Sequence, residues 1–242
     1  MSLLKSDAVY AILRRSILNA ELAPGRSLRA AELGEMTGYG PTPIREALTR
    51  LQAEGFVDGT ANRGFAVAPV TLAELEDLGA SRALLETELI LDSMAHADAD
   101  YEGRVIAAHH KLSRTPPPRL DSSDETIDRW SEVHEGFHTA LLSAARSPWQ
   151  LRLWRITEEH LRRYHRWLLR SRAAISADPS AADEALFAEV LALAPHTRLK
   201  DAVLAGDTTM VRRLMAEHIT LSTRTFLRLA GSTDSLPKVA AQ

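Results

Sequence analysis

The chain has 242 residues, which is enough for one large domain or two of moderate size. Hydrophobic residues make up 45% and charged residues 25%, as in an ordinary globular protein with a hydrophobic core. There is no cysteine, which excludes disulfides and thiolate metal sites, so any metal must be held by histidines and carboxylates. The formal net charge of −3 gives no sign of a nucleic-acid partner.

The charge is distributed unevenly along the chain. Residues 1–70 carry eight Lys or Arg and seven Asp or Glu, so the excess negative charge lies in the remainder. Every apolar run is shorter than the roughly eighteen residues that a membrane span needs, and the first residues have no signal-peptide pattern. We therefore expect a cytoplasmic protein with no membrane partner.

The first seventy residues show the pattern of a winged helix-turn-helix. Apolar side chains recur every three to four residues in the first segment, and Pro24 and Gly25 then form a turn. Gly38 is placed to end the second helix as a left-handed cap. The predicted elements are helices at 6–20, 30–37 and 42–54, followed by a hairpin of strands at 56–57 and 65–68.

From Thr71 onward the strand patterns disappear and helical patterns continue to the end. Thr71 and Glu74 form a capping box that opens the first of these helices. The predicted helices are 71–94, 101–114, 124–145, 148–172, 181–193, 196–205 and 208–230. The expected fold is therefore an N-terminal α/β winged helix-turn-helix over 1–70 and an all-α helical bundle over 71–230. A flexible tail is expected over 231–242.

Several ordered landmarks in the N-terminal segment resemble one family. Residues 38–48 read Gly-Tyr-Gly-Pro-Thr-Pro-Ile-Arg-Glu-Ala-Leu, with Arg-Leu at 50–51 and Glu-Gly-Phe at 54–56. Pro-Gly at 24–25 precedes them and Arg-Gly-Phe-Ala-Val at 63–67 follows. Together they resemble the GntR family of bacterial regulators, in which the stretch corresponding to 38–48 begins the DNA-recognition helix. This chain has Gly-Pro where family members often have Ser-Arg, just before that helix.

The chemistry of this segment fits contact with double-stranded operator DNA. A helix N-terminus offers backbone N–H groups and the Thr42 hydroxyl to phosphate. Arg45 is expected to read guanine, while Arg29 and Arg50 are better placed for phosphate. The wing tip at Arg63 and Gly64 is expected to approach the adjacent backbone or minor groove. The predicted DNA contacts are Arg29, Thr42, Arg45, Arg50, Arg63 and Gly64.

Landmarks in the C-terminal segment resemble the FadR-type effector-binding domain, called FCD. They are Arg82 with Glu86, the Phe-His pair at 137–138, and the segment from His196 through Gly-Asp at 206–207 to His218. Metal-binding members typically use one Asp and three His. Carried over, the resemblance places His138, His196 and His218 in the three His positions and His134 in the Asp position.

Three interpretations of these histidines stay open, and in one of them His134 is a surface residue and the other three are ordinary core histidines. Four neutral imidazoles can hold a divalent metal, zinc or nickel rather than magnesium, with an anionic ligand completing the coordination. Alternatively, the metal is absent and the histidines bind an organic acid directly, together with Arg82. The expected effector-binding residues are Arg82, His134, His138, His196 and His218, and the last four are the expected metal ligands. No organic cofactor is indicated.

The remaining histidines and a basic helix match no landmark. We expect surface positions for His96, His109, His110, His160 and His165. Arg152, Arg155, Arg162, Arg163 and Arg166 are expected to form a solvated face or a salt-bridge stripe rather than a second DNA site. Glu135 is expected to point away from the face of His134 and His138.

The expected function is that of a ligand-responsive transcription regulator. As the resemblance implies, a homodimer of this type binds a pseudo-palindromic operator as a repressor, and a small carboxylate effector changes its affinity. A metal-dependent hydrolase is the competing class. The chain has no His-Glu-x-x-His motif and no nucleophile elbow, so an enzyme is not expected.

Overall fold

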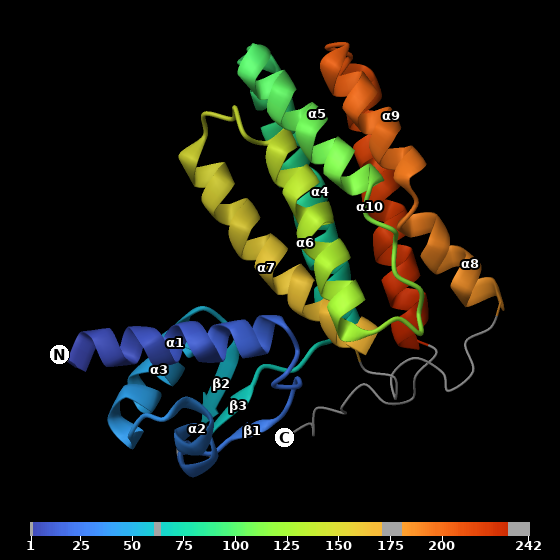
Figure 1. The fold of residues 1–242 in the computed structure, drawn as a ribbon. Coiled ribbons are helices and arrows are strands. Elements are labelled where there is room, and N and C mark those ends of the chain that lie inside the picture. The colour runs from blue at the N-terminus through green and yellow to red at the C-terminus, as the bar shows by residue number, and fades with distance from the viewer. Residues whose placement is uncertain (1, 61–63, 171–180, 232–242) are drawn as a thin grey trace.

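The computed structural model describes residues 2–60, 64–170 and 181–231 (Figure 1). The N-terminal unit packs three helices against a small antiparallel sheet with strand order β1-β3-β2. Its elements are α1 (Ser2–Leu18), β1 (Ser27–Leu28), α2 (Ala30–Thr37), α3 (Pro41–Ala53), β2 (Val57–Thr60) and β3 (Gly64–Val67). Arg63 at the wing tip lies outside the described residues.

The apolar periodicity of the first helix becomes the core of this unit. Val9, Leu13 and Ile17 are fully buried and belong to the same cluster as Leu48 and Leu51 of α3. Gly38 has a φ of 75° and donates its N–H to the carbonyl of Gly34, as predicted for a left-handed cap. The predicted hairpin is present, and β1 adds a third strand that the sequence did not indicate. Two residues are too few to show alternation.

The C-terminal unit is a helical bundle, which confirms the predicted fold class. Its helices are α4 (Leu72–Ala95), α5 (Ala99–Ser113), α6 (Asp124–Leu141), α7 (Pro148–Arg170), α8 (Ala181–Val190), α9 (Leu193–Leu204) and α10 (Thr208–Gly231). Among the described helices, none combines the length and apolar composition that crossing a membrane requires. Except for Gly231, the tail predicted at 231–242 lies outside the described residues.

Local capping explains several helix boundaries. The Thr71 side chain accepts a hydrogen bond from the Glu74 N–H, as predicted, and Asp207 accepts one from Met210 N–H at 2.9 Å. Helix α9 begins three residues earlier than predicted. Pro195 then falls in its first turn, where the missing N–H has no helical partner to lose.

Helix α7 joins the two units. Figure 1 shows its lower end beside α1 of the N-terminal unit. Arg163 donates to the carbonyl oxygen of Ala68 at 3.0 Å. His160 stacks on Phe56 with ring centroids 4.4 Å apart, and its Nε2 lies 3.1 Å from the Glu54 carbonyl oxygen. The prediction of a surface position for His160 is therefore wrong, because this interface covers it.

Candidate metal and effector site and DNA-binding surface

Four histidines converge inside the helical bundle. His134 and His138 come from adjacent turns of α6, His196 from α9 and His218 from α10. Each offers one ring nitrogen, and these atoms all lie within 4.8 Å of one another. The Nε2 of His134 lies 2.9 Å from that of His196 and 3.2 Å from that of His138. The structure thus brings together all four histidines singled out in the sequence.

Hydrogen bonds at the outer ring nitrogens determine where the lone pairs point. His196 Nδ1 lies 2.9 Å from the carbonyl oxygen of Ala192, which only accepts, so this nitrogen carries the proton. His138 Nδ1 likewise faces the Glu86 carboxylate at 2.5 Å. In the neutral rings, both Nε2 lone pairs therefore point into the cluster. A proton on His134 Nε2 can be donated to the lone pair of His138 or to that of His196, but not to both. A cation between the rings can bind both lone pairs.

The dimensions of the cluster fit a tetrahedral ion after small movements. Zinc–nitrogen bonds of about 2.0–2.1 Å place tetrahedral nitrogens roughly 3.3 Å from one another. The two short separations are 2.9 and 3.2 Å, and the longest is within 4.8 Å. The donor set of four imidazoles suits zinc or nickel and does not suit magnesium, which prefers oxygen ligands.

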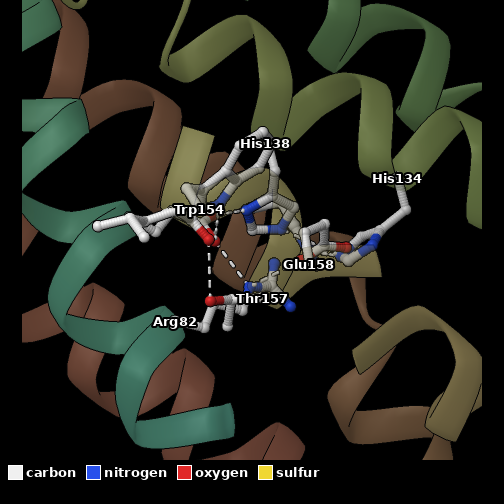
Figure 2. Close-up of polar contacts among 9 residues, drawn as sticks. Arg82, His134, His138, Trp154, Thr157 and Glu158 are labelled. Atoms are coloured by element: carbon white, nitrogen blue, oxygen red, sulfur yellow. Dashed lines mark hydrogen bonds and ion pairs between the residues drawn. The ribbon is translucent and has the colours of Figure 1, made fainter. Parts of the chain in front are cut away.

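A buried carboxylate, that of Glu86, orients the His138 ring through the nitrogen that faces away from the cluster. Glu86 is fully buried and also accepts from Arg82 Nε at 2.7 Å and from Trp154 Nε1 at 3.3 Å. Figure 2 shows Arg82, Trp154 and His138 arranged around this contact. Burial alone would raise the pKa of Glu86, but Arg82 and His138 hold it well below its usual range. Glu86 is therefore a charged partner that keeps His138 in the orientation a metal requires.

The electrostatics of the cluster favour neutral imidazoles. Burial is the main cause that lowers the pKa of His196 to about 3. Burial, followed by the neighbouring histidines, holds the pKa values of His134 and His218 well below the usual range. Near neutral pH these rings therefore have lone pairs ready for a metal without first losing a proton.

A cavity of about 60 Å³ lies against the cluster, and we call it the bundle cavity. This is several times the roughly 10–15 Å³ that one water needs, so it suits a small ligand. Glu158 lies 3.5 Å from Arg82, and burial raises its pKa to about 7. The lining of the bundle cavity includes Arg82, His134, Glu158, Arg162, Arg166 and His218.

Three expectations about α6 and α7 need correction. His165 is half-buried rather than exposed, and it stacks on Phe226 at a centroid distance of 3.9 Å. Arg163 and Arg166 are buried rather than solvated, although Arg162 and Arg166 do form salt bridges. Glu135 does not turn away from the histidine region, because it lines the bundle cavity and pairs with Arg162.

Four of the predicted DNA contacts, Arg29, Thr42, Arg45 and Gly64, line neighbouring grooves on the N-terminal unit. Thr42 and Arg45 are exposed on the first turns of α3, and Arg45 forms no ion pair with any described residue. Arg29, Arg45 and Gly64 line the same groove between α3, β1 and the hairpin. Gly40 at the N-cap makes no side-chain hydrogen bond to the helix. The backbone N–H groups in the first turn of α3 are therefore available for phosphate.

Arg50 lies on the same helix but is already engaged. Its Nη1 atom contacts Asp7 at 2.5 Å, and its guanidinium lies 4.0 Å from the centre of the Tyr10 ring. Phosphate binding by Arg50 would have to compete with the Asp7 carboxylate. Arg45 is thus the better candidate for direct contact with bases.

Comparison with known proteins agrees with both halves of this architecture. Residues 5–67 match the family described as "Bacterial regulatory proteins, gntR family", and residues 77–221 match the FCD domain. The chain belongs to the GntR family. It is a transcription regulator of the type that joins a GntR helix-turn-helix to an FCD effector-binding domain.

Relatives of this GntR regulator extend over most of its length. It is 30% identical over 214 residues to an uncharacterized HTH-type transcriptional regulator, BphR, of Paraburkholderia xenovorans, covering 88% of this chain and 81% of that protein. It is 29% identical to the HTH-type transcriptional repressor GlaR of Escherichia coli, covering 87% and 90%. A solved transcriptional regulator GntR from Rhodococcus sp. RHA1 shares the fold, with a TM-score of 0.67 at 20% identity, covering 92% and 97% of the two chains.

Sequence reasoning missed several residues of the FCD site in this GntR regulator. Glu86 was part of a landmark but had no assigned contact, and Glu158 and Trp154 had no landmark at all. The only available signal was the four-residue spacing of Arg82 and Glu86, which is typical of a helical ion pair. Trp154 and Glu158 reach the site because α7 packs along α4 in the bundle.

Proposed function

We propose that this GntR–FCD protein is a cytoplasmic repressor that binds a pseudo-palindromic operator as a homodimer and responds to a small organic acid. The DNA-binding unit is assigned to residues 1–70 and the effector-binding unit to 71–230. The convergence of four histidines beside the bundle cavity carries the proposal. The name of the relative GlaR supports the direction of regulation, since that protein is a repressor.

The four histidines would hold a divalent ion, zinc or nickel, through one ring nitrogen each. When bound, such an ion would supply a positive charge, and by taking more than four ligands it would also accept a carboxylate. This chain's own residues orient the imidazoles, exclude bulk water and present Arg82 toward the same cavity. Arg82 is shared with Glu86 and Glu158, so it supports the effector rather than binding it alone.

Homodimer formation is supported by exposed apolar side chains on two neighbouring helices. Leu84 of α4 is 68% exposed, and Trp149, Leu153 and Ile156 of α7 are 69%, 48% and 49% exposed. Beside them, Asp77 on α4 and Arg152 and Arg155 on α7 are exposed charges of opposite sign. A two-fold axis can place α7 of one copy on α4 of the other, which pairs these charges and buries the apolar side chains.

The dimer surface is tested by the mass of the protein in solution. We expect Leu153→Glu to shift the wild-type dimer toward monomer in analytical ultracentrifugation. Ile106→Glu is the matched control, because Ile106 is 51% exposed on α5, away from this face. Equal masses for Leu153→Glu and the wild type would place the dimer interface elsewhere.

The metal is tested by its amount in untagged protein purified without chelators. We expect near-stoichiometric zinc or nickel in the wild type and its loss in His138→Ala. His134→Asp restores the ligand type of the metal-binding relatives and should retain the metal. If the wild type and both variants contain no metal, the metal proposal is overturned, and direct binding of an organic acid by the histidines and Arg82 takes its place as the proposal to test.

A further inference from the structure

We propose that the bundle cavity contains a second anion-binding subsite, formed by Arg162 and Arg166 of α7, which takes the distal carboxylate of a two-headed acid. The inference rests on the proposed function, in which one carboxylate of the effector binds beside the four histidines. It adds the chemical class of the effector: a dicarboxylic acid rather than a monocarboxylic acid.

The cavity has positive groups contributed by different helices. Arg82 of α4 lines it together with His134 and His218, while Arg162 and Arg166 enter from α7. A ligand with a carboxylate at each end can satisfy both groups, whereas a monocarboxylate leaves one of them unused. Because four neutral imidazoles add no negative charge, an ion among them would keep its full charge and favour a doubly charged ligand.

The α7 arginines have hydrogen-bonding capacity to spare. The Nε atoms of Arg162 and Arg166 are buried and have no hydrogen-bond partner among the described residues. Arg166 is 6% exposed, and a buried N–H without an acceptor is costly. A guanidinium presents a planar fork that matches a carboxylate, so a ligand carboxylate supplies the missing acceptors once these side chains turn toward the cavity.

The present acidic partners of these arginines can be released to solvent. Arg162 Nη1 lies 3.0 Å from Glu135, whose side chain is 24% exposed, and Arg166 Nη1 lies 2.5 Å from Asp128, whose side chain is 36% exposed. Both acids come from α6 and retain access to water. A ligand carboxylate therefore competes with partly solvated groups rather than with fully buried ones.

Arg166 also connects this subsite to the DNA-binding unit. Its Nη1 donates to the Asn19 side chain at 3.0 Å, and Asn19 follows directly after α1. A carboxylate that draws Arg166 into the cavity weakens this contact between the two units. The distal end of the ligand would thereby change how firmly the DNA-binding unit is held against α7.

The subsite is tested by calorimetry on the full-length protein with its native metal content. Malonate, succinate, glutarate and adipate are each compared with the monocarboxylate of equal carbon number, from propionate to hexanoate. We expect the best diacid to bind about tenfold tighter or more than its matched monoacid. Arg162→Gln should bring the ratio of diacid to monoacid affinity close to one and leave metal content and monoacid affinity unchanged. Arg166→Lys should lower the same affinity ratio. Arg104→Gln, at an exposed position of α5, should leave the diacid-to-monoacid ratio unchanged.

The outcomes separate this inference from the proposed function. Equal binding of mono- and diacids by the wild type, or a diacid preference that survives Arg162→Gln, overturns the subsite but leaves the acid-responsive regulator in place. If no acid of either kind binds, both are overturned. The link to DNA is tested with Asn19→Ala, which should bind the diacid normally but show a smaller diacid-induced change in operator affinity. An unchanged operator response in Asn19→Ala refutes the role of this contact.

Discussion

The Nδ1 atom of His138 lies 2.5 Å from the Oε1 atom of Glu86, and both side chains are almost fully buried. This contact connects a candidate metal ligand on α6 to a carboxylate on α4, and the same carboxylate accepts from Arg82 and Trp154. Partners of this kind fix the orientation of a ligating imidazole and increase its basicity. The relationship gives Glu86 a function that can be measured separately from that of the four histidines.

Replacing Glu86 should therefore weaken metal binding without removing a ligand. In Glu86→Gln the amide oxygen can still accept from His138, but the charge is lost, and we expect metal affinity to fall about 10- to 100-fold. Competition with a chromogenic chelator measures this change. Trp154→Phe is the control, because it removes a neutral donor to Glu86 and should have a much smaller effect. Wild-type affinity in Glu86→Gln would show that this carboxylate does not support the metal.

Arg45 should account for a large part of sequence-specific DNA recognition. It is exposed on the first turns of α3 and has no ion-pair partner among the described residues. We expect Arg45→Ala to weaken operator binding by roughly 1–3 kcal/mol, with little change for non-specific DNA. Fluorescence anisotropy with operator and scrambled duplexes measures both affinities. Arg104→Ala, at an exposed position of α5, should change neither, and equal losses on both duplexes would mean that Arg45 contacts phosphate only.

The stacked pair of His160 and Phe56 should couple the two units. His160→Leu removes the ring stack and the hydrogen bond to the Glu54 carbonyl, so we expect a loss of about 1–2 kcal/mol in the free energy of unfolding. The change in operator affinity caused by the effector should also become smaller. Chemical unfolding and anisotropy titrations measure the two effects. His110→Leu, at an exposed position of α5, is the control, and a full effector response in His160→Leu would contradict the coupling.

His165 should make the metal-free protein sensitive to acid. Burial lowers the pKa of His165 to about 3 in the folded protein, below its usual value of 6.5. The unfolded chain then takes up a proton below pH 6.5 that the folded chain does not. The stability present above that pH is therefore lost as the pH falls toward 3.

For His165 this loss amounts to about 2 kcal/mol between pH 7 and pH 5. Phenylalanine can keep the stack on Phe226 without titrating, so His165→Phe should reduce the acid-induced loss by that amount. Urea unfolding of chelator-treated wild type and variant at the two pH values provides the measurement. Identical pH dependence in both proteins would show that His165 does not contribute to acid sensitivity.

Much of the fold follows from local patterns in the sequence. The spacing of Val9, Leu13 and Ile17 predicts the buried face of α1, because a helix places side chains three and four residues apart on one face. Thr71 and Asp207 predict helix starts, since their side chains can reach N–H groups two or three residues onward. These are short-range effects of backbone geometry, and the structure confirms them.

Local sequence patterns alone did not predict which residues surround the site. The spacing of His134 and His138 places them on one helix face, but their approach to His196 and His218 was expected mainly from resemblance to FCD domains. The burial of His160 and His165 was missed, because the surfaces that cover them come from Phe56 and Phe226, far away in the chain. Periodicity cannot indicate which distant side chain will lie above a polar residue.

The sequence by itself determined the order and type of the elements, the helix caps and the family, because these depend on neighbouring residues and on ordered motifs. Only the tertiary structure decided that Glu86 holds His138, that Arg162 and Arg166 enter the bundle cavity, and that Arg166 contacts Asn19. Each of these contacts joins side chains at least 50 residues apart or opens onto a space bounded by several helices. Such arrangements arise from helix packing, in which many small contacts across the core jointly fix the position of each side chain.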